Sequence, residues 1–218
     1  MIIALEGIDG SGKTTQYNRI CDALRADDVE FTPLSFPRYA EPSSMLVRQY
    51  LSGEFGAADS VNAYAAASFF AVDRYATLKT INAVGANSSV NTNRARVVLA
   101  DRYVGSNAIY QAAKLDTTSE QTSFFRWLDD YEFERLGLPR PDMTLYFDIS
   151  PKLAIERIRN RGGVLDVHEQ DAHYLERCAR CAARASEFFG WIMLDASRSE
   201  NIVFAEVYER ILTAITKR

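Results

Sequence analysis

The chain has 218 residues, of which 47% are hydrophobic and 25% charged, a composition that excludes extensive disorder. Because domains commonly have about 150 residues, we expect one domain over residues 1–218 that carries an elaboration. The formal net charge of −4 excludes a general attraction to nucleic acid or anionic membranes. An anionic ligand must therefore be bound by a local cluster of donors.

The apolar segments and the cysteines indicate where the protein resides. The apolar run at residues 1–5 lacks a basic flank and is too short for a signal peptide. No stretch approaches the roughly 18 apolar residues of a membrane span. The cysteines, Cys21, Cys178 and Cys181, are odd in number, which does not suit a disulfide framework. We therefore expect a cytoplasmic protein with neither a membrane nor a nucleic-acid partner.

Short apolar runs alternate with helical patterns along the chain. Strands are predicted at residues 2–5, 31–36, 97–100, 143–149 and 191–194. Helices are predicted up to about residue 25 and over 43–52, 60–84, 104–135, 151–160, 168–188 and 200–216. We expect residues 87–93 to form a surface loop and Arg161–Gly163 to form a hinge. The alternation predicts an α/β fold with a parallel sheet flanked by helices.

A glycine-rich segment follows the first predicted strand and precedes a helix. Residues 7–14 fit the phosphate-loop pattern G-x-x-x-x-G-K-[ST]. The glycines let backbone N–H groups converge on a phosphate, Lys13 adds a positive charge, and Thr14 can ligate magnesium. The segment expected to bind ATP comprises Gly7, Ile8, Asp9, Gly10, Ser11, Gly12, Lys13, Thr14 and Thr15.

A carboxylate and an arginine follow the strand predicted at residues 97–100. In parallel sheets the carboxyl ends of the strands line the ligand crevice, which is where Asp101 and Arg102 are expected to lie. Asp101 can orient the waters of a magnesium ion. The planar fork of Arg102 can hold an acceptor phosphate with two hydrogen bonds.

Three arginines are concentrated at the end of the helix predicted at 151–160. Arg157 and Arg161 are four residues apart and share a helical face, whereas Arg159 points elsewhere. Glycines follow at positions 162 and 163, so this cluster can move. We expect a lid at about residues 157–167 that carries cations onto a transferring phosphoryl group.

Together these motifs resemble the thymidylate kinase family. The resemblance rests on residues 6–16, 36–39, 73–74 and 101–107 and on the arginine-rich lid, in the same order. It implies a five-stranded parallel sheet of the phosphate-loop nucleoside monophosphate kinase fold, and a homodimer. It further implies magnesium-dependent transfer of the γ-phosphoryl group of ATP to dTMP, giving dTDP in dTTP synthesis.

The resemblance also implies roles for individual side chains around dTMP. Asp9 would lie near the 3′-hydroxyl, and either Arg38 or Tyr39 would hold the acceptor phosphate together with Arg102. An aromatic pocket, base-edge contacts and a wall against C2′ would be formed by Phe36, Phe70, Arg74, Asn107 and Tyr110.

The remaining implied roles concern the metal and the lid. Asp166 would contact the nucleotide, and the metal would lie near Thr14, Asp9, Asp101 and Glu169. Because the phosphate loop contains no arginine, Arg157 and Arg161 are the cations expected to act in catalysis from the lid. The other expected catalytic residues are Lys13, Asp9 and Arg102.

Two alternatives remain at this point. The first is a kinase for another nucleoside monophosphate or for a deoxynucleoside. The second is a nucleotide sensor that binds ATP without turnover, although a sensor has no need of Asp101, Arg102 and the lid cluster together.

Overall fold

A single parallel sheet organises the chain, of which the computed structural model describes residues 1–57, 60–86, 97–161 and 172–217. Its strand order is β2-β3-β1-β4-β5. The strands are β1 (Ile2–Glu6), β2 (Phe31–Ser35), β3 (Val97–Asp101), β4 (Met143–Asp148) and β5 (Ile192–Asp195). The predicted α/β fold is therefore confirmed, with strand ends that differ from the predicted ones by one or two residues.

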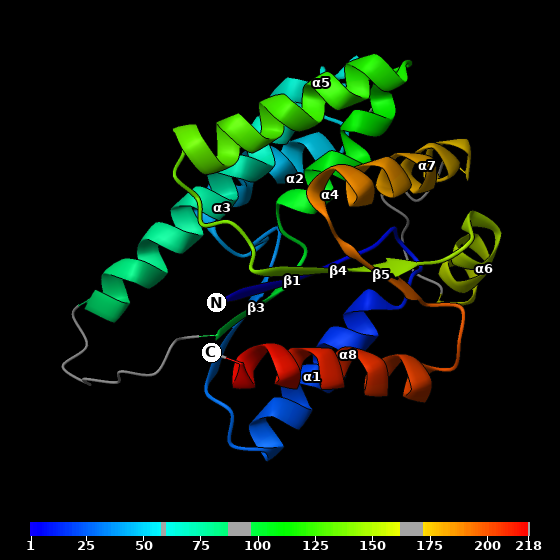
Figure 1. Ribbon diagram of the computed structural model, residues 1–218. Coiled ribbons are helices and arrows are strands. Elements are labelled where there is room, and N and C mark those ends of the chain that lie inside the picture. The colour runs from blue at the N-terminus through cyan, green and yellow to red at the C-terminus, as the bar shows by residue number, and fades with distance from the viewer. Residues whose placement is uncertain (58–59, 87–96, 162–171, 218) are drawn as a thin grey trace.

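Helices cover both faces of the sheet. They are α1 (Lys13–Ala26), α2 (Met45–Leu51), α3 (Ala63–Ala86), α4 (Val104–Tyr110), α5 (Thr118–Asp129), α6 (Pro151–Arg161), α7 (Ala172–Phe189) and α8 (Glu200–Thr216). Helices α1 and α8 lie on one face, while α4 and α7 lie on the other, with α3 and α5 beyond them (Figure 1). In the described part of the chain, no helix combines the length and the apolar composition that crossing a membrane requires.

The prediction of one helix over residues 104–135 is wrong. The segment divides into α4, the 3₁₀ turn η3 (Ala112–Lys114), α5 and the π-helical segment η4 (Asp130–Arg135). Thr117 begins α5 with a capping box, in which its hydroxyl accepts from the Glu120 N–H and the Glu120 carboxylate accepts from the Thr117 N–H. A further 3₁₀ turn, η1 (Pro42–Ser44), precedes α2.

The strand order creates a crevice between β1 and β3. The chain leaves β1 through α1 toward β2 on one side, and leaves β3 through α4 and α5 toward β4 on the other. These connections run over opposite faces, so they diverge at the carboxyl ends of the two paired strands, where Leu5 lies beside Asp101. Ligands of open α/β sheets bind at such a divergence. The predicted loop at 87–93 and the hinge at residues 162–163 lie outside the described residues.

Gly10 fixes how closely α6 packs against the loop between β1 and α1. Its φ is 79°, and an added Cβ would lie 2.3 Å from the carbonyl oxygen of Ala154 in α6. Gly137 has a φ of 64°, but an added Cβ there would meet no atom within 4 Å. The two glycines therefore separate the cost of the left-handed backbone from the cost of the steric clash.

We predict that Gly10→Ala destabilises the protein by more than Gly137→Ala does. Gly137→Ala should cost only the backbone strain of about 1–2 kcal/mol, whereas Gly10→Ala must also displace α6. Urea unfolding measures the free energy, and nucleotide titration should show weaker binding for Gly10→Ala alone. Equal losses in the two variants would show that α6 yields without cost.

Candidate active site

The segment between β1 and α1 forms a cradle of backbone N–H groups. Gly10 and Gly12 have φ values of 79° and 83°, and the N–H of Ser11 bonds the carbonyl of Ile8 at 3.1 Å. The cradle opens into a cavity of about 510 Å³. The cavity is lined by all residues from Ile8 to Gln16 together with Arg102, Arg157, Ile158, Ala196, Arg198, Glu200 and Val203. Its size and its helix N-terminus suit the phosphate chain of a nucleotide.

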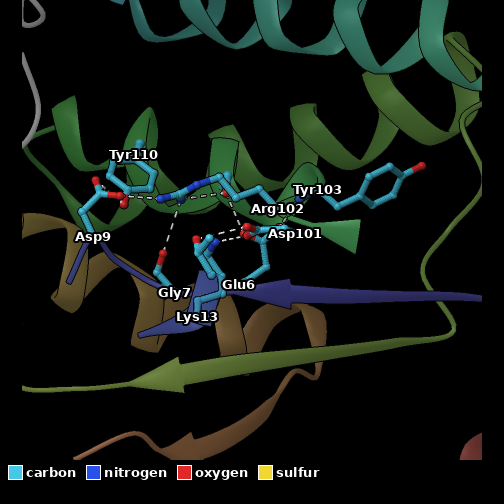
Figure 2. A network of polar contacts seen from close by, with 10 residues as sticks. Glu6, Gly7, Asp9, Lys13, Asp101, Arg102, Tyr103 and Tyr110 are labelled. Atoms are coloured by element: carbon cyan, nitrogen blue, oxygen red, sulfur yellow. Dashed lines mark hydrogen bonds and ion pairs between the residues drawn. The ribbon is translucent and has the colours of Figure 1, made fainter. Parts of the chain in front are cut away.

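Lys13 and Thr14 both reach across the crevice to β3. The Lys13 ammonium forms an ion pair with Asp101, and the Thr14 hydroxyl donates to the same carboxylate at 3.1 Å (Figure 2). Burial, reinforced by the guanidinium of Arg102, lowers the pKa of Lys13. The phosphate loop is thus tied to the end of β3.

Arg102 adopts a backbone conformation that is uncommon for a residue with a side chain. Its φ is 67°, and its guanidinium donates to the Asp9 carboxylate and, at 3.4 Å, to the Gly7 carbonyl (Figure 2). Strained backbone of this kind persists where the surrounding structure holds it and is concentrated at functional sites. The turn directs Arg102 back over the phosphate loop.

Glu6 holds this turn, although the sequence analysis did not select it. Its side chain is buried and accepts from the Tyr103 N–H and the Ser106 hydroxyl, both at 2.7 Å. Burial raises the pKa of Glu6. A Cβ on Gly105 would come within 2.9 Å of the carboxylate, so a side chain there would have to displace Glu6. The available signal was an acidic residue that ends an otherwise apolar strand just before the glycine-rich loop.

A second cleft adjoins the cradle on the side of α3 and α4. Its lining includes Asp9, Phe36, Tyr39, Phe70, Arg74, Arg102, Asn107 and Tyr110. Of the acceptor-site residues expected within the described part of the chain, Arg38 is missing from this lining. Its guanidinium pairs with Glu41 at 3.2 Å instead, and its N–H donates to Asp73 at 2.8 Å.

Asp9 lies where the two cavities meet. It lines both of them, as Arg102 does. The Tyr110 hydroxyl donates to the Asp9 carboxylate at 2.8 Å, and the Arg102 guanidinium lies 5.2 Å from the centre of the Tyr110 ring. Burial raises the pKa of Tyr110 well above its usual value, so this hydroxyl keeps its proton. Asp9 is therefore held by a cation and a neutral donor (Figure 2).

Arg74 and Asn107 form a buried wall of the second cleft with a partner that the sequence analysis missed. Arg74 is only 1% exposed and forms an ion pair with Glu132 of η4, which is fully buried. Asn107 also donates to Glu132, at 2.9 Å. No local pattern links these positions, because Glu132 is 58 residues from Arg74 and 25 from Asn107.

Arg157, a member of the predicted lid cluster, contacts the cradle. Its guanidinium donates to the carbonyls of Ser11 at 3.4 Å and of Ala196 at 3.1 Å. Arg161 ends α6, but its side chain is outside the described residues, as are Asp166 and Glu169. The structure brings together the remaining predicted site residues except Arg38.

Several oxygen-bearing side chains lie at the cradle. The Thr14 hydroxyl donates to Asp101 at 3.1 Å, Asp9 lines the same cavity, and the buried hydroxyl of Ser11 has no hydrogen-bond partner among the described residues. Across those residues, no group of three or more histidine, cysteine or acidic side chains could enclose a metal ion. This donor set suits a hard cation that a substrate's phosphates help to bind.

Comparison with known proteins agrees with this geometry. The family model for thymidylate kinase matches residues 5–207. A thymidylate kinase of Mycobacterium tuberculosis is 36% identical over 205 residues, which cover 90% of this chain and 92% of the relative. One from Tropheryma whipplei is 30% identical over 224 residues, covering 100% and 96%, and one from Xanthomonas euvesicatoria is 28% identical over 221 residues, covering 100% and 86%. The chain therefore belongs to the thymidylate kinase family.

Proposed function

We propose that this protein transfers the γ-phosphoryl group of ATP to dTMP, giving dTDP for dTTP synthesis. Membership of the thymidylate kinase family supports this reaction. The observation that carries the proposal is the junction of two cavities at Asp9 and Arg102, which line both. A donor phosphate in the cradle and an acceptor phosphate in the second cleft would meet there.

Magnesium fits the oxygen donors of the cradle. Thr14 and Asp101 would hold the ion directly or through its waters, with Asp9 and Glu169 nearby, and a carboxylate–hydroxyl set suits this cation. When bound, the ion neutralises charge on the donor phosphates. Asp101 has a second task, because it also holds the Lys13 ammonium at the loop.

The chain's own contribution to transfer is positioning and charge stabilisation. The loop amides and Lys13 bind the donor phosphates, while Arg102 binds the acceptor phosphate and Arg157 covers the loop. Arg161 lies one helical turn beyond Arg157 and would join it in the closed state. Asp9 orients the sugar and is not needed as a base, because a phosphate monoester is largely ionised near neutral pH.

The second cleft matches the chemistry of a thymine deoxynucleotide. Phe70 would stack on the base and Phe36 would close the nucleoside pocket, since aromatic faces bind flat rings. Arg74 and Asn107 offer polar groups to the base edge. Of the two residues considered for the acceptor phosphate, Tyr39 is favoured because it lines the cleft, whereas the Arg38 guanidinium pairs with Glu41. Asp166 of the lid would close over the nucleotide.

A panel of acceptors tests the proposed reaction. With ATP and magnesium, the protein should phosphorylate dTMP in preference to other nucleoside monophosphates and to thymidine. Lys13→Ala should lower kcat by about 100-fold or more, because Lys13 stabilises charge that develops in transfer. Preference for another acceptor would replace dTMP in the proposal. ATP binding without turnover of any acceptor would identify a sensor.

Sugar selection can be tested at Tyr110, whose ring forms part of the cleft wall. We predict that Tyr110→Ala narrows the preference for dTMP over its ribose counterpart by about 1–3 kcal/mol, because the ring leaves no room for a 2′-hydroxyl. Tyr110→Phe should keep that preference and lower kcat/KM for both sugars, because Asp9 loses the donated hydrogen bond. Steady-state kinetics on both substrates checks this. If Tyr110→Phe relaxes the preference equally, the hydroxyl and not the ring reads the sugar.

We propose that two chains associate through α3. Val72 and Tyr75 on this helix are 46% and 39% exposed, and Phe55, at 41%, packs against the Phe69 ring beside them. Exposed apolar side chains gathered in this way are typical of protein interfaces.

A cytoplasmic location is part of the proposal, since all three cysteines are free thiols.

Val72→Arg should convert the dimer into monomers, because a charge would be buried at the contact. Sedimentation velocity at several protein concentrations measures the change. Ile202→Arg is a matched control, since Ile202 is 53% exposed on α8 and away from α3. A wild-type protein that is monomeric at all concentrations would rule out the dimer.

A further inference from the structure

Glu132 is a fully buried carboxylate that lies behind the cleft wall without lining the cleft. It belongs to the π-helical segment η4 and accepts from two cleft residues, Arg74 and Asn107. Segments of π-helix occur often at functional sites. A buried charge is costly unless it is paired, so these contacts hold all three side chains in one arrangement.

The contacts of Asn107 determine which of its atoms can face a ligand. Its side-chain nitrogen donates to the Ala67 carbonyl at 3.0 Å and to Glu132 at 2.9 Å. An amide nitrogen has only two N–H groups, so both are engaged. The Asn107 oxygen is left as the polar atom for the cleft, where it can act only as an acceptor.

The contacts of Arg74 leave hydrogen-bond donors for the cleft. Its Nε donates to Glu132 at 2.7 Å, one Nη2–H donates to the other carboxylate oxygen, and Nη1 donates to the Tyr103 carbonyl at 3.4 Å. A guanidinium has five N–H groups and no acceptor, so two donors remain. The wall of the cleft therefore offers a donor at Arg74 beside an acceptor at Asn107.

We propose that Glu132 is a positioning residue that sets base specificity, because it fixes this donor–acceptor order. A thymine or uracil edge presents the O4 acceptor beside the N3–H donor and matches the wall. Cytosine presents an amino group at C4 and an unprotonated N3, and mismatches it at both positions. The wall does not read the C5-methyl group. This inference rests on the proposed function, because it assumes that the base lies in this cleft.

The experiment compares dTMP, dUMP and dCMP as acceptors for the wild type and for Glu132→Gln. In the native site one Glu132 oxygen accepts from both the Arg74 Nη2 and the Asn107 Nδ2, and the other oxygen accepts from the Arg74 Nε. Glutamine replaces one of these oxygens with an N–H donor, so either the Arg74 Nε–H loses its acceptor or, with the amide reversed, the Asn107 amide faces a donor and is no longer held in one orientation. We expect kcat/KM for dTMP and dUMP to fall by about 10- to 100-fold, with little loss for dCMP. The ratio of kcat/KM for dTMP to kcat/KM for dCMP therefore falls, whereas the corresponding ratio for dTMP and dUMP and the KM for ATP stay unchanged.

Glu134→Gln is the matched control. Glu134 lies on the same segment, with its side chain 62% exposed, and pairs with Arg140 at 2.8 Å on the surface. Its variant should keep all acceptor ratios. Thermal unfolding of each variant shows whether it is folded.

A second variant covers the case in which Glu132→Gln fails to fold. Glu132→Asp keeps the buried negative charge for Arg74 and withdraws the carboxylate by one methylene, so the dTMP/dCMP ratio should narrow here too. A folded variant that loses activity equally on all three acceptors would overturn the proposal, since the carboxylate would then be purely structural. Failure of both variants to fold would overturn it for the same reason.

The wild-type data separate this inference from the proposed function. If the wild type does not phosphorylate dTMP, the function itself fails. If it prefers dTMP to dCMP and the folded Glu132 variants keep that preference, only the role of Glu132 fails.

Discussion

The ion pair between Lys13 and Asp101 is the interaction on which the site depends. It joins the phosphate loop after β1 to the end of β3, the two paired strands from which the chain diverges over opposite faces of the sheet. Arg102 follows Asp101 directly and lines both cavities, so the same link sets the position of the second cleft relative to the cradle. An acidic protein with a net charge of −4 can thereby concentrate positive charge at one point.

Buried carboxylates orient most of the functional groups. Glu6 holds the turn that carries Arg102, Asp101 holds Lys13, and Glu132 holds Arg74. Each carboxylate restricts the motion of a cation or of a strained turn. Such preorganisation lets a site act without rearranging during the reaction. The carboxylates that contribute to the negative net charge therefore include the groups that hold the cations of the site in place.

The sequence allowed prediction of features that depend on neighbouring residues. The phosphate loop and the five strands are local patterns, and they were located to within a residue or two. The helix over 104–135 was overextended because its apolar periodicity continues through the breaks, although the Thr117 and Glu120 capping pair marks one of them.

Features that depend on contacts distant in the sequence were missed. Glu132 resembles any acidic residue on a helix until folding places it against Arg74. Likewise, that Tyr39 and not Arg38 lines the second cleft was visible only in the fold, where Asp73, 35 residues away, accepts from the Arg38 N–H. Asp73 and Arg74 were recognised as a pair through a family resemblance, and their separate partners became visible only in three dimensions.

One turn of α3 connects the outside of the molecule to two parts of the wall of the second cleft. Val72 and Tyr75 face outward, whereas Asp73 and Arg74, between them, are each 1% exposed. Asp73 accepts from the Arg38 N–H at 2.8 Å and from the Ser43 hydroxyl at 2.6 Å, so it anchors the segment that carries Tyr39, while Arg74 is part of the buried wall of the second cleft. A small rotation of this turn would move both anchors together. A substitution at position 72 or 75 that shifts this turn would therefore also displace Asp73 and Arg74 from their partners on the opposite side of the helix.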